Sequence, residues 1–156
     1  MKKCNMKVRH LLYLFAILSL LTAMFIYGNS LKSIPESSAQ SSAVADKIQD
    51  VVDPEKKVEP SVFHNLIRKT AHIIEFFALG IFVGGFAICL GYEQQKRLIS
   101  MPWLIVLLIA VGDEWIQVYA ERGSLVTDVI IDFSGALAGL LMASMLHQLV
   151  VKIKKK

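Results

Sequence analysis

The chain has 156 residues, of which 54% are hydrophobic and only 19% are charged, and its mean hydropathy is +0.52. Soluble domains carry roughly 25% charged residues. The composition therefore excludes an ordinary soluble protein and indicates a protein embedded in a lipid bilayer.

Four apolar runs account for this hydropathy, and each is close to the roughly 20 residues that a helix needs to cross a bilayer. They are Leu11 to Tyr27, Ile73 to Leu90, Trp103 to Tyr119 and Val129 to Val151. Backbone groups in hydrocarbon find no water to bind, so these runs should be helices. We predict an all-α, four-helix polytopic membrane bundle in a single domain, residues 1–156, with spans at about 10–28, 70–91, 101–120 and 128–151.

The first run could also be a cleaved signal peptide, because basic residues precede it. Its apolar part is long for a signal peptide, and Phe25-Ile26-Tyr27 does not resemble a small-residue cleavage site, which favours an uncleaved anchor. Cys4 and Cys89 lie far apart in the sequence, and nothing supports a disulfide between them.

The basic residues predict the orientation. With both termini in the cytoplasm, ten of the 17 basic residues and only one of the 13 acids face inward, which satisfies the positive-inside rule. The net charge of +4 then reflects topology and does not indicate a nucleic-acid partner. We therefore expect a multi-pass protein of the cell membrane.

Ten polar residues collect near the outer ends of the last three spans in this topology. They are Arg68, Lys69, His72 and Glu75 on the second span, Asp113, Glu114 and Gln117 on the third, Arg122 in the loop that follows, and Asp128 and Asp132 on the fourth. His64, Arg68, His72 and Glu75 share one helical stripe. Asp113 and Glu114 each lie one turn from Gln117, and Asp128 and Asp132 lie one turn apart. An ionised side chain at the centre of a lipid-facing helix costs roughly 2.5–3.5 kcal/mol. The spacing and this cost predict an outward-facing polar cluster inside the bundle.

Small residues on the fourth span indicate a packing face. Gly135 and Gly139 form a small-xxx-small pattern, and Ser134 and Ala138 form a second one alongside it. In the first outer loop, about 29–60, Val44, Ile48 and Val51 recur at helical spacing and predict a short amphipathic helix. A solvated connector is the alternative for that segment.

Several segments carry a resemblance to a known family. IRKTAHIIEFFALG (67–80), GDEWIQ (112–117), the following ERG, and DVIIDFSGALAG (128–139) resemble the VanZ-like family of small bacterial membrane proteins, and ESSAQSSAVADKI (36–48) resembles its first outer loop. The resemblance implies a polytopic helical protein of the cell envelope. In the name-giving member it also implies low-level resistance to the glycopeptide antibiotic teicoplanin. The ten polar residues match the polar positions of the family. Tyr119-Ala120-Glu121 departs from the apolar-Pro-Gly turn of many relatives.

Each group of polar residues leaves alternatives open. His72 and Glu75 could form a metal pair, a proton-transfer pair or part of an interhelical network, and the last is favoured. Asp113 and Glu114 could act as acid and base, although ion pairs with Arg68 or Arg122 are favoured. The basic residues could instead hold an anion such as a lipid phosphate. Ser124, Thr127 and Ser134 lack the spacing of a nucleophile, and no cofactor or resident metal is expected.

Two functional hypotheses follow. The first is a VanZ-like envelope protein that confers low-level glycopeptide resistance through its outward-facing polar site. The second is a membrane enzyme that acts by acid/base chemistry on a lipid-linked or acylated envelope substrate, with His72 and Glu114 as candidate proton carriers. A transporter is disfavoured, because the inner halves of the spans are almost wholly apolar.

Overall fold

The computed structural model describes residues 6–31, 45–53, 57–96, 98–120 and 126–154. These residues form four long helices, and a short helix at residues 45–52, with no strand among them. The long helices are α1 (Met6–Ser30), α3 (Pro60–Gln94), α4 (Ser100–Tyr119) and α5 (Val126–Ile153). Each is long and apolar enough to cross a membrane. The prediction of an all-α chain with four membrane helices is confirmed.

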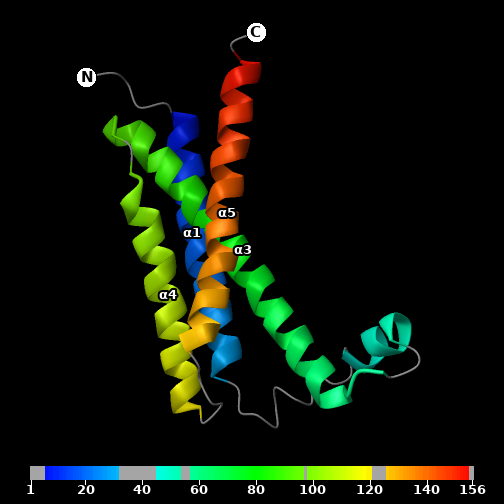
Figure 1. Cartoon of the computed structure of the whole chain (residues 1–156). Coiled ribbons are helices and arrows are strands. Elements are labelled where there is room, and N and C mark those ends of the chain that lie inside the picture. Colours follow the sequence, from blue (N-terminus) through cyan, green and yellow to red (C-terminus); the bar gives the residue numbers. More distant parts are fainter. Residues whose placement is uncertain (1–5, 32–44, 54–56, 97, 121–125, 155–156) are drawn as a thin grey trace.

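The helices form a bundle in which α3 makes the most extensive contacts, first with α5 and then with α1. The described ends of the chain lie together at one end of the bundle, which we call the termini end (Figure 1). At the opposite end, α1 and α4 finish and α5 begins (Figure 1). We call this the polar end.

Helix α3 is longer than predicted, with 35 residues instead of a span at about 70–91. Pro60 occupies its first turn, where a missing N–H costs nothing, and Glu59 is the N-cap residue. At a rise of about 1.5 Å per residue the helix is about 52 Å long. Its first turns lie to one side of the other long helices at the polar end, on the right in Figure 1.

The core lies where α3 crosses the other helices. Large side chains of α1, α3 and α4 are fully buried there. Ile26 of α1, Phe76 and Leu79 of α3, and Val106 of α4 are all 0% exposed. They belong to one cluster that also includes small residues of α5. The core thus fixes α3 in the middle of the bundle, with one face turned to each neighbour.

Helices α3 and α5 approach each other so closely that only glycine fits at the crossing. A Cβ atom on Gly139 would overlap the Phe77 carbonyl oxygen, and one on Gly80 would overlap the Ala136 carbonyl oxygen. Gly135 faces the backbone of Ile73 in the same way. Two residues of the predicted packing pattern, Ser134 and Ala138, lie on the exposed side of α5. The close approach therefore runs along the Gly135 and Gly139 stripe.

The short helix at residues 45–52 falls where the sequence predicts one. Ala45 and Gln49 are its buried residues, while Val51 of the predicted apolar stripe is 81% exposed and Val44 lies outside the described residues. The Gln49 side-chain amide donates to the Val58 carbonyl at 2.9 Å. His64 of α3 lies 3.0 Å from the Asp46 carboxylate. These contacts hold the short helix against the start of α3 and the segment just before it.

Candidate functional site

The buried carboxylate of Asp113 is the centre of a polar cluster at the polar end. Its side chain is 0% exposed. The Ser30 hydroxyl of α1 donates to one carboxylate oxygen at 2.6 Å, and the Gln117 amide, one turn further along α4, donates to the other at 2.7 Å. Hydrogen bonds of this length to a carboxylate are the strong, charge-assisted kind. Asp113 thus ties the end of α1 to α4.

His72 brings α3 into the same cluster. Its Nδ1 atom lies 3.9 Å from a carboxylate oxygen of Asp113 and 3.9 Å from one of Glu75. The Asn29 side-chain amide of α1 donates to the other oxygen of Glu75 at 3.2 Å. These distances are too long for hydrogen bonds, but a protonated imidazole at this position would be attracted to both carboxylates.

Helix α5 contributes two aspartates at different depths. Asp128, in the first turn, accepts a 2.6 Å hydrogen bond from the Lys69 ammonium group of α3. Asp132, one turn deeper, is only 3% exposed and lies beside His72 and Asp113. Asp113 lies six residues before the end of α4 and Asp132 six residues after the start of α5. Both are therefore about 9 Å from their helix ends, which explains why they meet.

A small cavity of about 20 Å³ lies beside this cluster, large enough for about one water molecule. Its walls come from α3, α4 and α5, and charged or amide side chains form almost all of them. The lining residues are Arg68, Lys69, His72, Glu114, Gln117, Asp128, Ile131 and Asp132. The cavity thus offers two cationic groups beside buried carboxyl groups, an arrangement that can hold water or a small part of an anionic ligand.

The cluster also contains a set of potential metal ligands. One donor atom each from His72, Asp113 and Asp132 lies within 4.8 Å of the others. Both oxygens of Asp113, however, already accept hydrogen bonds from Ser30 and Gln117. Each carboxylate oxygen keeps a second lone pair, so these bonds leave room for a cation, but the contacts observed between the helices are those of an interhelical polar network.

A comparison with protein families shows to which family the chain belongs. The model of the family described as VanZ/LLP1 matches residues 11–147, which is most of the chain. The chain belongs to the VanZ/LLP1 family. No curated protein and no solved structure matches it.

The match confirms the family that the sequence motifs indicate, and this VanZ/LLP1 protein is a membrane protein of that family. The matched range includes every residue of the polar cluster, from Asn29 and Ser30 to Asp132. The cluster is therefore built within the part of the chain that defines the family.

Two features of the polar residues differ from the interpretation based on the sequence. His64 lies on the first turns of α3, against Asp46, and not with His72. Asp113 is held by the neutral donors Ser30 and Gln117, together with His72, whereas the sequence favours ion pairs with arginine. Arg122 lies outside the described residues.

Asn29 and Ser30 are the members of the cluster that sequence reasoning missed. They follow directly after the apolar run of the first span and resemble the start of a loop. In the structure α1 continues through both of them and ends at Ser30, which is 0% exposed. The signal available in the sequence is the short distance from the run, since one more helical turn carries both residues to the depth of Glu75 and Asp113.

Proposed function

We propose that this VanZ/LLP1 protein works in the bacterial cell envelope with both termini in the cytoplasm and its polar end facing outward. There its polar cluster lowers the action of glycopeptide antibiotics such as teicoplanin, by binding an anionic or lipid-linked envelope component. The family membership supports the envelope role. The observation that carries the proposal is the convergence of Ser30, His72, Asp113 and Asp132 from all four long helices at one end of the bundle.

The α3 side of the cavity supports an anionic ligand, although Lys69 already pairs with Asp128 and three of the eight lining residues are carboxylic acids. Arg68 and Lys69 line the cavity on its α3 side, and a guanidinium group binds phosphate or carboxylate through two parallel hydrogen bonds. The buried carboxyl groups behind them keep the cavity polar at membrane depth. An anionic head group at the outer surface would meet the cations first, with its lipid part in the bilayer.

Antibiotic susceptibility tests the proposal directly. A sensitive Gram-positive host expresses the wild type, Asp132→Asn or Asp113→Asn, and teicoplanin and vancomycin susceptibility is measured with the membrane abundance of each protein. The matched control is Asp46→Asn, which removes a carboxylate on the short helix, away from the cluster. We expect the wild type and the control to protect, and the cluster variants to lose protection at equal abundance. Absence of protection by the wild type would refute the antibiotic role.

A fusion of a fluorescent protein to the C-terminus tests the orientation. A green fluorescent protein becomes fluorescent in the cytoplasm but stays dark when the general secretion pathway exports it unfolded. A fluorescent fusion agrees with the proposed topology, and a dark fusion at normal abundance contradicts it.

The position of His72 between two carboxylates favours a second candidate function. This is an acid/base enzyme that acts on a lipid-linked or acylated substrate, with His72 and Glu114 as proton carriers. Incubation of the purified protein with envelope lipids, followed by mass spectrometry, should reveal a product that Glu114→Gln does not form. If Glu114→Gln loses membrane abundance in step with activity, the effect is on folding and this candidate fails.

A further inference from the structure

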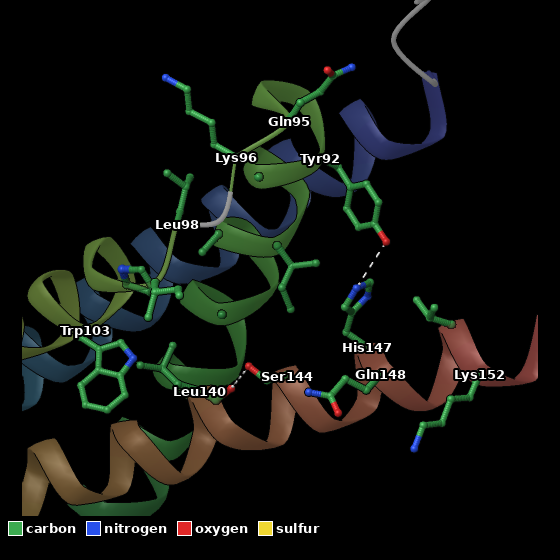
Figure 2. A pocket seen from close by; sticks show the side chains of 17 residues that line it. Tyr92, Gln95, Lys96, Leu98, Trp103, Leu140, Ser144, His147, Gln148 and Lys152 are labelled. Carbon is green, nitrogen blue, oxygen red and sulfur yellow. Dashed lines mark hydrogen bonds between the residues drawn. The ribbon is translucent and has the colours of Figure 1, made fainter.

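The termini end of the bundle contains a much larger groove than the polar end. Its volume is about 880 Å³, within the range of about 300–1,000 Å³ that ligand pockets occupy. The end of α3, the start of α4 and the second half of α5 form its walls (Figure 2). It shares no residue with the polar cluster, so it is a separate feature of the molecule.

The deep part of the groove is apolar. Gly84 and Ala87 of α3 line it and are buried, and α5 packs so closely there that a Cβ atom on Gly84 would lie 2.8 Å from the Ala143 Cβ atom. Pro102 of α4 and Leu140 of α5 complete the apolar lining. An apolar groove within a membrane helix bundle is poorly hydrated, so the natural occupant of this part is a hydrocarbon chain.

The rim of the groove is cationic. Lys96, just after α3, and Lys152, near the end of α5, project on opposite sides of it (Figure 2). No Asp or Glu occurs among the described residues that line the groove. The nearby carboxylate of Glu93 lies 3.4 Å from Arg9 of α1 instead. Two lysines with apolar walls below them match an amphiphile that has a negatively charged head.

Aromatic side chains mark the level at which that head would sit. The Tyr92 hydroxyl and the His147 ring nitrogen lie 3.3 Å apart and join α3 to α5 along one side of the groove (Figure 2). Trp103 stands on the α4 side near Leu140, deeper in the groove, and is 47% exposed (Figure 2). Tyrosine is enriched at the boundary between lipid tails and head groups. The boundary thus passes between the small residues and the lysines.

We propose that this groove binds an anionic phospholipid, with an acyl chain against Gly84, Ala87 and Leu140 and its negatively charged head group at the cationic rim that Lys96 and Lys152 form. In the orientation proposed above, the lipid comes from the cytoplasmic leaflet, where juxtamembrane basic residues attract anionic lipids. The binding is a second activity of the chain and does not depend on the function of the polar end.

Lipid retention by the purified full-length protein tests the proposal. The protein in detergent is mixed with equal amounts of phosphatidylglycerol and phosphatidylcholine, and bound lipid is counted by native mass spectrometry. The test variant is Lys96→Gln with Lys152→Gln. The matched control, Lys7→Gln with Lys154→Gln, removes two lysines at the same end that do not line the groove.

We expect the wild type and the control to prefer phosphatidylglycerol. In the test variant the ratio of bound phosphatidylglycerol to bound phosphatidylcholine should fall about tenfold. Ser144→Phe, which fills the groove and keeps both lysines, should reduce retention of both lipids. Equal retention of the two lipids by the wild type, or an unchanged preference in the test variant, would overturn the proposal. Cross-linking of Gln148→Cys to a second copy across the groove would also overturn it and assign the groove to a dimer interface.

Discussion

Replacement of Gly139 by alanine should destabilise the bundle strongly, although it adds only a methyl group. The new Cβ atom would lie 2.9 Å from the Ile81 backbone nitrogen and 3.0 Å from the Gly80 Cα atom, and it would overlap the Phe77 carbonyl oxygen. All of these obstacles are backbone atoms of α3, so no side chain can rotate to make room. Helix α5 must move away from α3 instead.

The size of the effect follows from the required movement. Ordinary contacts begin near 3.4 Å, so relief of the Ile81 contact alone needs a shift of about 0.5 Å, and the Phe77 carbonyl needs more. Overpacking of this kind costs about 1–3 kcal/mol. A chain of this size then loses several degrees of Tm.

Gly28→Ala is the matched control. Gly28 lies in α1, and a Cβ atom added there would have no neighbour within 4 Å, so alanine brings only its higher helix propensity. Thermal unfolding of the purified variants in one detergent measures both effects. We expect Tm to fall for Gly139→Ala and to stay or rise slightly for Gly28→Ala. Equal Tm values for the two variants would refute the inferred close contact of α3 and α5.

Three further predictions concern polar contacts. Ser30→Ala should lower the free energy of unfolding by about 1–2 kcal/mol, because it removes a donor from the buried Asp113 carboxylate, whereas Ser19→Ala, whose hydroxyl binds its own helix at Phe15, should have little effect in the same denaturation assay. Lys69→Gln should cost less than about 1 kcal/mol at low salt and nothing measurable at high salt, because the Lys69 side chain is 41% exposed; a larger loss would contradict this. The backbone amides of Val58 and Lys57 donate to Asp53 and hold the pKa of its carboxyl group below the ordinary 3.8. This stabilisation is present above pH 3.8 and is lost as pH falls through the lowered pKa, so hydrogen-exchange protection of the Val58 amide should decline in that acidic range and, at neutral pH, in Asp53→Ala.

The membrane helices could be predicted because hydropathy and length alone determine which segments cross a bilayer. The same criterion could not find the start of α3. Residues 61–69 are too polar to count as a membrane span, and their helix is supported by Pro60 in the first turn and by contacts with the short helix at 45–52. Those contacts depend on tertiary structure.

Helical spacing predicted which polar residues share a stripe on α3, but not how deep each of them lies in the bundle. His64 shares a stripe with Glu75, but eleven residues separate them, which is about 16 Å along a helix. Only the part of the stripe nearer to Glu75 reaches the depth of Asp113. The roles of Asn29 and Ser30 could not be predicted from spacing, because they depend on where α1 ends relative to α3 and α4.

The origin of the cluster residues also has a consequence for how the protein is made. Ser30, His72, Asp113 and Asp132 come from the first, second, third and last membrane helices in order of synthesis. The cluster is therefore completed only when the final helix has left the ribosome and entered the bilayer. Until then the buried acids of α4 lack their neighbours on α5, so a nascent chain that stops before α5 exposes a defect that membrane quality control can recognise.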